Sequence, residues 1–387
     1  MKNVALLSAF DVKNYGSMLQ SYAIQQLLKR AGCNNKIVYY KEKNIKKQFL
    51  RIFDKTLLKA KLNFIYRDFY GKFLDKDLGT YFENRDIVFD TFVSQYLELT
   101  DFIPNRKDLS NKIKEYDIVL VGSDQVWNPT LLKKDFYTMT FVPDEITKVA
   151  YSSSFGVASI PDNQKKVTAN YLSRFNHIGV RELSGQKIIK ELIGRDVPVV
   201  ADPTILLSID QWETLIDKKP LIDEEYIFCY FLGSNSMHRD FVRKLRLASG
   251  CKIVTIPHCD GIVKADIGFG DSSPQGIGPR EFLNLVKNAK YVCTDSFHCC
   301  VFSILFARNF FVFSRFKENA NKRASTNSRI HSFLQIANLS DRLVNEGAEP
   351  TPDMLTNIDY RSTMLRIEEL RSRSFDYLYE SLGISRE

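Results

Sequence analysis

The chain has 387 residues, of which 44% are hydrophobic and 26% are charged, and it carries a net charge of +8. This composition excludes fibrous, low-complexity and integral membrane proteins, since no apolar run approaches the roughly 20 residues needed to cross a bilayer. The length exceeds that of a single domain of about 100 to 200 residues and predicts two domains.

The spacing of the seven cysteines gives neither CxxC pairs nor a regular framework. They predict a reducing, cytoplasmic environment rather than a disulfide framework. Zinc requires clustered ligands, and the nearest thing to a cluster, residues 258–260, has no partner set. We therefore expect no metal and no cofactor.

In the first half of the chain, apolar strand-like runs alternate with helical patterns. The runs span residues 4–8, 36–40, 118–121, 149–152 and 197–201, and the first helix is expected over 17–31. Strands separated by helices indicate a parallel sheet. Because Asp11 and Lys13 follow the apolar start at once, we interpret it as the first strand and not as a leader. We assign residues 1–207 to a first Rossmann-like domain.

A basic segment interrupts this domain. Residues 41–76 contain eleven Lys or Arg against four Asp or Glu, within a helical insert at about 41–110. Apolar residues interleave with the basic ones. The pattern suits a helix on an anionic membrane surface or near a phosphorylated acceptor, and equally a solvated helical hairpin with one packed apolar side. No recognised nucleic-acid motif accompanies the charge, so we expect no nucleic-acid partner.

The second half repeats the alternation. Strands are expected at 226–232, 252–256, 291–293 and 310–313, and helices at 237–248 and 279–288. After a linker at 208–225, we assign residues 208–387 to a second Rossmann-like domain with terminal helices over 358–382. The predicted fold class is α/β, with two doubly wound domains facing a cleft.

His298 occupies a position where chemistry is expected. In open parallel sheets, ligands bind beyond the carboxyl ends of the strands, beside helix N-termini that attract anions. His298 follows the strand at 291–293 and opens an apolar helix, with Asp295 and Ser296 at the same strand end. Because histidine exchanges protons near neutral pH, His298 is the candidate catalytic residue. The alternative is a polar cap on a core helix.

Polar loops also follow the strands of the first domain. Asn14, Tyr15 and Gly16 lead into the first helix and could hold an anion. Ser154 belongs to a hydroxyl-rich loop that is either a phosphate cradle or a helix cap. In the loop after 118–121, polar groups could bind substrate and an indole could stack on a sugar face, the alternative being a structural turn with a buried tryptophan. The candidates in that loop are Ser123, Asp124, Gln125 and Trp127.

Basic side chains complete the candidate site. Arg181 closes a strand and is suited to bidentate binding of a carboxylate or phosphate, the alternative being a salt bridge to Glu182. Asp202 follows the run at 197–201 in what resembles another polar strand-end turn, but an aspartate there is more often the cap of the next helix. The loop after the strand at 310–313 would form a positive wall near His298, the alternative being a solvated surface loop. Its candidates are Arg315, Lys317 and Arg329.

Six ordered motifs of the chain resemble the polysaccharide pyruvyl transferase family. They are NYGSMLQSYAIQQLL (14–28), VGSDQVWNP (121–129), SSSFG (152–156), GVRE (179–182), ADPT (201–204) and TDSFHCCVFSILF (294–306). The resemblance extends from residue 4 to about 345, apart from the segment 41–110. It implies a two-domain, glycosyltransferase-B-like fold. It also implies transfer of a pyruvyl group from phosphoenolpyruvate, the co-substrate, to a sugar of a bacterial cell-surface polysaccharide, forming a ketal.

The resemblance assigns roles to residues. His298 matches the family's catalytic histidine, and Arg181 matches an arginine that holds phosphoenolpyruvate. Members tend to have an arginine two residues before the histidine, where this chain has Ser296. Arg315, Lys317 or Arg329 could supply the missing charge. Cations and helix N-termini are needed because phosphoenolpyruvate carries about three charges.

Two other functions fit the same features. A glycosyltransferase using a nucleotide sugar would share the architecture and the strand-end histidine. A non-catalytic protein that binds a sugar or an anion would explain why Ser296 stands where family members tend to have an arginine. The pyruvyl transferase interpretation predicts phosphoenolpyruvate and a sugar or lipid-linked oligosaccharide as partners. It places the protein in the cytoplasm, at the inner face of the membrane if residues 41–76 touch lipid.

Overall fold

A computed structural model describes residues 1–42, 76–258, 262–315 and 328–386. Residues 43–75, which make up nearly all of the basic segment expected to touch a membrane, lie outside this description, and so does Lys317. Within the described ranges, no helix combines the length and the apolar character needed to cross a membrane.

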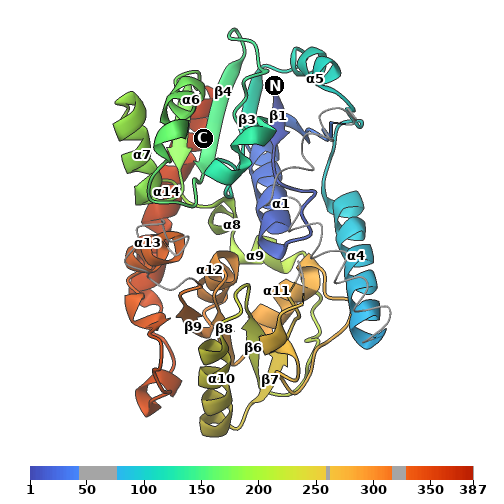
Figure 1. Cartoon of the computed structure of the whole chain (residues 1–387), viewed down its shortest axis with the longest axis vertical. Coiled ribbons are helices and arrows are strands. Elements are labelled where there is room, and N and C mark those ends of the chain that lie inside the picture. Colours follow the sequence, from blue (N-terminus) through green and yellow to red (C-terminus); the bar gives the residue numbers. More distant parts are fainter. Residues whose placement is uncertain (43–75, 259–261, 316–327, 387) are drawn as a thin grey trace.

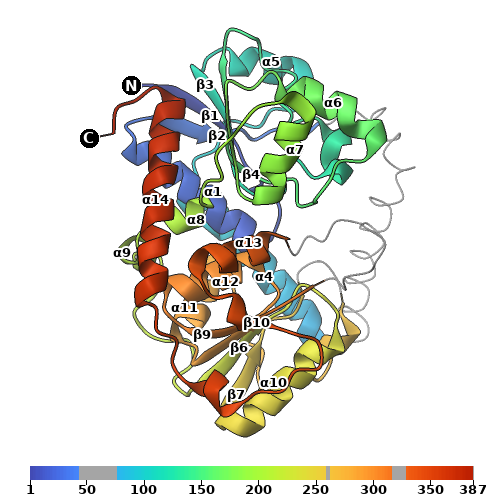
Figure 2. The same ribbon diagram turned by 90° about the vertical axis from the view of Figure 1, so that its left-hand side faces the viewer.

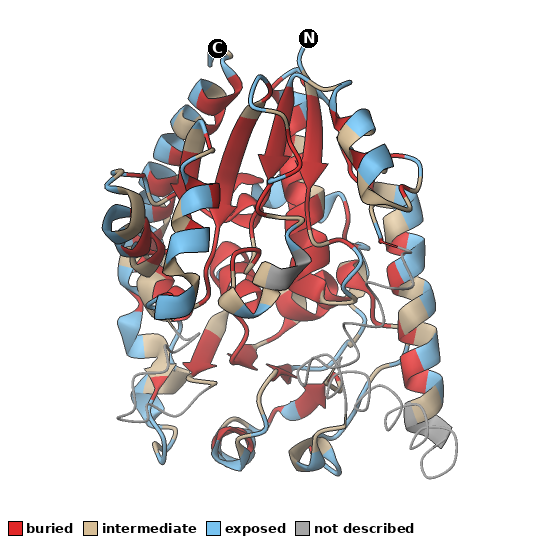
Figure 3. Cartoon of the chain, turned by 45° about the horizontal axis from the view of Figure 1, so that its top comes forward, coloured by how far each residue is buried: buried red, intermediate tan, exposed pale blue. Residues whose placement is uncertain are grey.

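The first sheet contains five parallel strands in the order β2-β1-β3-β4-β5. The strands are β1 (Asn3–Leu7), β2 (Asn34–Ile37), β3 (Ile118–Val121), β4 (Thr147–Ser153) and β5 (His177–Val180). The helices of this half are α1 (Tyr15–Arg30), α4 (Lys76–Tyr96), α5 (Arg106–Ile113), α6 (Asp162–Leu172) and α7 (Leu183–Ile193). The central strands are buried along nearly their whole length, as Figure 3 shows. A strand covered on both faces favours a continuous apolar run, and Ile118–Val121 is such a run.

The second sheet also has five parallel strands, in the order β10-β9-β8-β6-β7. The strands are β6 (Tyr226–Tyr230), β7 (Lys252–Thr255), β8 (Tyr291–Thr294), β9 (Asn309–Phe313) and β10 (Leu343–Val344). Its helices are α10 (Ser236–Ser249), α11 (Pro279–Asn288), α12 (Phe297–Leu305) and α13 (Ser328–Ala337). The predicted α/β class with two parallel-sheet domains is therefore confirmed.

One predicted strand is wrong. Residues 197–201 form no strand, and Val199 makes only an isolated bridge to Val180 of β5. Pro198 has no N–H to donate to a ladder, although its carbonyl accepts from Val180 at 3.1 Å. Beyond it, the N–H of Ala201 donates to the Ser374 hydroxyl at 2.8 Å instead of to a neighbouring strand. The apolar run is thus a connection that lies along the edge of the sheet.

Helices between the two sheets hold the domains together (Figure 1). Each residue of α12 is buried, which fits a helix that is apolar on all sides. One hydrophobic cluster includes Leu19 of α1, Phe228 of β6 and Val301 of α12, so the core is continuous across the domains. Two short helices, α8 (Pro203–Leu206) and α9 (Ile209–Glu213), lie on the connection from the first domain to the second.

The C-terminal helix α14 (Arg361–Leu382) runs alongside both domains (Figure 2). Near its start, the Thr363 hydroxyl donates to the Ala337 carbonyl of α13 at 3.0 Å. Near its end, the Tyr377 hydroxyl donates to the Ala150 carbonyl of β4 at 2.9 Å. A Cβ on Gly179 would lie 2.6 Å from the Tyr377 ring, so this close packing requires a glycine in β5. Short 3₁₀ turns occur at Pro129–Lys134, Lys264–Asp266, Ser340–Arg342 and Pro352–Leu355.

Candidate functional site

The first turns of α1 and α12, which come from different domains, meet at His298. Asn14 caps α1, because its side-chain oxygen accepts from the N–H groups of Gly16 at 3.0 Å and Ser17 at 3.3 Å. A Cβ on Gly16 would lie only 2.0 Å from Nδ1 of His298. Glycine is therefore the residue that lets the helix start approach the histidine. The His298 side chain is buried at this contact.

Asp202 links His298 to Arg181. Its Oδ2 accepts from the Ser123 hydroxyl at 2.7 Å and from Nη1 of Arg181 at 2.8 Å. Nε2 of His298 lies 3.5 Å from the same oxygen, and it has no hydrogen-bond partner among the described residues. Burial alone would raise the pKa of Asp202, but His298 and Arg181 together hold that pKa well below its usual range. Asp202 is therefore a buried anion that holds Arg181 and faces His298.

Asp202 also performs the capping role predicted for it. Its Oδ1 accepts from the backbone N–H of Thr204 at 3.0 Å and from the Thr204 hydroxyl at 2.7 Å, at the start of α8. The helix cap accounts for one carboxylate oxygen and the candidate site uses the other. The cap could be predicted from the sequence, whereas the contact of the second oxygen with Arg181 and His298 depends on how distant segments pack.

Arg181 is enclosed by three acidic side chains and one ring. Besides Asp202, it lies 3.6 Å from Oδ1 of Asp124 through Nη2 and 4.0 Å from Oε2 of Glu182 through Nε. Its guanidinium lies 4.7 Å from the centre of the Phe297 ring. The partner suggested by sequence, Glu182, is thus more distant than Asp202. Nε and Nη2 of Arg181 have no hydrogen-bond partner within the described residues, although both atoms are buried.

Asp124 connects the two domains at this point. It adopts a φ of 84°, in the left-handed region, and its Oδ2 accepts from the Ser17 hydroxyl at 2.7 Å. Nη1 of Arg329, from α13, lies 3.9 Å from its Oδ1. Burial would raise the pKa of Asp124, but Arg181, His298 and Arg329 lower it overall. The candidate site therefore brings together Ser123, Asp124, Arg181, His298 and Arg329, with Gln125 beside them.

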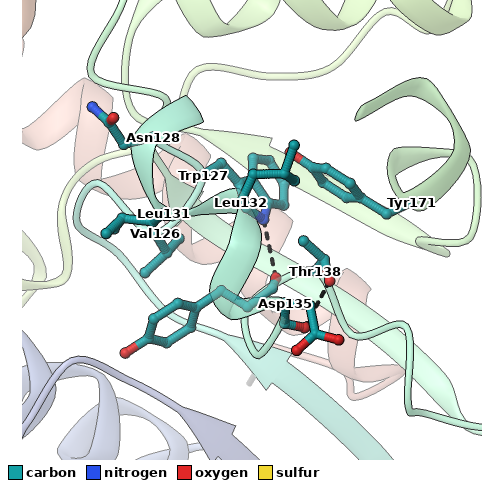
Figure 4. Close-up of a pocket in the computed structure, with 9 residues that line it drawn as sticks. Val126, Trp127, Asn128, Leu131, Leu132, Asp135, Thr138 and Tyr171 are labelled. Atoms are coloured by element: carbon teal, nitrogen blue, oxygen red, sulfur yellow. Dashed lines mark hydrogen bonds between the residues drawn. The ribbon is translucent and has the colours of Figure 1, made fainter. Parts of the chain in front are cut away.

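The rings of two candidates, Tyr15 and Trp127, are buried. The Tyr15 ring stacks on Phe282 of α11 at 4.7 Å between ring centres, so anion binding by this turn, which stays a prediction, would use its backbone. Trp127 is also buried, packs against Phe155 and donates its indole N–H to the Tyr137 carbonyl at 3.1 Å. The indole forms one wall of a small pocket, shown in Figure 4, to which His298, Arg181 and Arg329 do not contribute.

Other candidates have structural partners. Ser154 is fully buried and donates to Oε1 of Glu182 at 2.8 Å. Asp295 uses both carboxylate oxygens to accept from the N–H groups of Leu232 at 2.6 Å and Gly233 at 2.8 Å. Arg315 donates to the Asp295 carbonyl at 3.1 Å. Ser296 is the residue before α12 and makes no side-chain cap there. These contacts hold the strand-end loops in place.

The arrangement can bind an anion and move a proton. It offers two buried guanidinium groups and an imidazole, and buried carboxylates counter the positive charge. Among the described residues, no group of three or more histidine, cysteine or carboxylate side chains could hold a metal ion.

Comparison with solved structures shows the same fold. The chain matches UDP-GlcNAc 2-epimerase from Methanocaldococcus jannaschii with a TM-score of 0.52 and 11% identity, over 99% of both chains. It matches MnaA from S. aureus, solved with UDP, with a TM-score of 0.53 and 11% identity, over 100% of this chain and 98% of that one. These likenesses confirm the two-domain, glycosyltransferase-B-like arrangement.

Comparison with sequence families is more specific. A search of curated proteins found no match. The family model for polysaccharide pyruvyl transferase matches residues 14–315, a range that includes Asp124, Arg181, Asp202 and His298. The matched range covers most of the chain, in agreement with the resemblance of the six motifs. The chain belongs to the polysaccharide pyruvyl transferase family.

Proposed function

We propose that the protein transfers the pyruvyl group of phosphoenolpyruvate to two hydroxyls of a sugar, forming a ketal and releasing inorganic phosphate. Membership of the family supports this proposal. The observation that carries it is the buried contact of His298 with Asp202, 3.5 Å apart, beside an arginine that has unpartnered N–H groups. A proton carrier and an anion-binding group thus lie together where two helix N-termini meet.

The proposed reaction balances with the substrates alone. The methylene carbon of phosphoenolpyruvate gains a proton and becomes a methyl group, which makes the central carbon electrophilic. Two sugar hydroxyls form C–O bonds to that carbon as the C–O bond to phosphate breaks. The two hydroxyl protons end on the methyl group and on the phosphate. No oxidant, reductant or further co-reactant is needed.

His298 and Arg181 have separate roles in this scheme. His298 exchanges the proton between an acceptor hydroxyl and the substrate, and Asp202, 3.5 Å from Nε2, stabilises the imidazolium that forms. Arg181 binds the anionic donor through the N–H groups that make no hydrogen bond within the described residues. Burial of these groups strengthens each charge interaction, because the local dielectric constant is lower than that of water.

The acceptor is proposed as a sugar of a cell-surface polysaccharide or of its lipid-linked precursor. The family description names a polysaccharide. A lipid-linked acceptor would place the protein at the cytoplasmic face of a membrane, where phosphoenolpyruvate is available.

Phosphate release from phosphoenolpyruvate in the presence of a panel of oligosaccharide acceptors tests the function. We expect release that depends on an acceptor, and a fall in kcat of about 10²- to 10⁴-fold in His298→Asn, since general acid–base catalysis contributes this much. His177→Asn at the start of β5 is the matched control and is expected to retain the wild-type rate.

Two results would contradict the proposal. Undiminished turnover in His298→Asn would remove the histidine from the mechanism. A glycosyltransferase would be favoured instead if a nucleotide sugar, but not phosphoenolpyruvate, raised the unfolding temperature in a thermal-shift assay and no phosphate were released.

A further inference from the structure

Arg329 is a buried cation that shares its nearest carboxylate. It is 7% exposed, and Nη1 lies 3.9 Å from Oδ1 of Asp124. That same Oδ1 lies 3.6 Å from Nη2 of Arg181 and accepts from the N–H of Gln125 at 2.8 Å. Arg181 has Asp202 as a close partner at 2.8 Å, whereas the structure shows no such partner for Arg329 within the described residues.

Arg329 and Arg181 lie close to the same aromatic ring. The two guanidinium carbons are 6.0 Å and 4.7 Å from the centre of Phe297. Burial, together with the positive charge of Arg181, lowers the pKa of Arg329 to about 9, so Arg329 remains a cation at neutral pH. Asp124 is the carboxylate that both arginines face, whereas Asp202 and Glu182 lie beside Arg181.

The two arginines retain unused hydrogen-bond donors. The Gln125 carbonyl oxygen, in the amide orientation that satisfies both of its ends, accepts from Nη1 of Arg329 at 3.2 Å and also from Nη2. This contact fixes the guanidinium and leaves its Nε without a partner among the described residues. Nε and Nη2 of Arg181 are also buried and make no hydrogen bond within the described residues, although Glu182 lies 4.0 Å from Nε and Asp124 lies 3.6 Å from Nη2. Unpaired buried N–H groups on two guanidinium ions favour an oxyanion as ligand.

We propose that Arg329 and Arg181 form a clamp for the phosphate group of the substrate, with one arginine contributed by each domain. The proposal rests on the proposed function and adds to it a second phosphate ligand, from α13, which lies beyond the range matched by the family model. A phosphate carries up to two negative charges and accepts several hydrogen bonds, so it matches two guanidinium groups better than a single carboxylate does. Ser296 is neutral, and Arg329 supplies from another helix the positive charge that position 296 lacks.

Binding of inorganic phosphate and of pyruvate, measured by isothermal titration calorimetry on the full chain, tests the clamp. We expect Arg329→Gln to weaken phosphate binding by about 10- to 100-fold, the effect of losing charged hydrogen bonds, and to leave pyruvate binding unchanged. The KM for phosphoenolpyruvate should rise by a similar factor. Arg361→Gln removes an equal charge from an arginine that is 91% exposed and should change neither quantity.

A purely structural role for Arg329 predicts a different result. The variant would then unfold at a lower temperature and bind phosphate as tightly as the wild type, which would overturn the clamp. An equal loss of pyruvate affinity would also overturn it, because it would assign Arg329 to the carboxylate. If Arg329→Gln does not fold, Arg329→Lys keeps the charge without the planar fork, and we expect at least a tenfold loss of phosphate affinity.

The clamp and the function fail in distinguishable ways. The clamp alone is rejected if the wild-type protein releases phosphate from phosphoenolpyruvate and the Arg329→Gln variant binds phosphate as tightly as the wild type. Wild-type protein that neither binds phosphoenolpyruvate nor releases phosphate would reject the function itself.

Discussion

At the scale of single residues, Asp202 joins a helix start to the two side chains on which the proposed chemistry depends. Its Oδ1 caps α8 and its Oδ2 holds Arg181 and faces His298. Burial would raise its pKa, yet His298 and Arg181 lower it, so the folded state favours the ionised carboxylate. A group of this kind stabilises the fold above its pKa in the unfolded chain, about 3.9, and loses that contribution as the pH falls toward the folded value.

Asp202→Asn is therefore expected to lower the free energy of unfolding by about 3–5 kcal/mol at pH 7, because Arg181 loses its closest anion. The difference from wild type should shrink below about pH 4, where the wild-type carboxylate also loses its advantage. Urea denaturation across pH 3 to 7 measures both effects, with the exposed Asp223→Asn as the control. A difference that stays constant over this range would show that Asp202 acts through its shape and not through its charge.

The residues of the site were predictable to different extents. His298 and Arg181 could be selected because strand ends are the usual place for ligands, and the structure brings them to the same carboxylate. The burial of the Tyr15 ring could not be predicted, because a loop sequence does not show which way a side chain points. Its partner, Phe282, is distant in the sequence. The proximity of Arg329 to Arg181 likewise depends on domain packing.

At the scale of elements, the start of α1 determines where the imidazole can lie. Asn14 fixes the first turn, and Gly16 lets the turn approach His298 more closely than any side chain would allow. The predicted strands mostly agree with the structure because buried parallel strands need uninterrupted apolar runs. The run at 197–201 has the same apolar character. It forms no strand, because Pro198 has no N–H to donate to a ladder and the N–H of Ala201 donates to the Ser374 hydroxyl of α14.

Gly16→Ala is expected to displace the imidazole, because the new methyl group would lie 2.0 Å from Nδ1 of His298. A displacement of about 1 Å costs about 10²-fold in rate, so we expect a fall in kcat of this size for phosphate release. Gly122→Ala is the matched control, since a Cβ there would meet its neighbours at 3.7 Å, an ordinary contact. Equal rates for the two variants would contradict the positioning role of the first turn.

At the scale of the whole molecule, Tyr15 fastens the domains to each other. Its hydroxyl donates to the Ile277 carbonyl at 3.0 Å, and its ring packs against Phe282 and, at 5.4 Å, Tyr230 of the second domain. The same turn that positions the histidine therefore also anchors the opposite domain. Domain packing and the geometry of the site are coupled through neighbouring residues, Tyr15 and Gly16.

Substitutions of Tyr15 should separate its hydrogen bond from its packing. Tyr15→Phe is expected to lower the free energy of unfolding by about 1 kcal/mol, the value of one hydrogen bond. Tyr15→Ala should lower it by about 3–5 kcal/mol, because it also leaves a cavity between the domains. Chemical denaturation measures both. A cost below about 1 kcal/mol for Tyr15→Ala would mean that the ring contributes little to the interface.

The path of α14 has a consequence for protein engineering. This helix is last in the sequence, but it supplies the Tyr377 and Ser374 side chains that satisfy Ala150 and Ala201 of the first domain. A fragment of residues 1–207 would lack these contacts, and so would a chimera that takes only this segment from a relative. A swap of the first domain between relatives therefore requires residues 361–382 to be transferred with it.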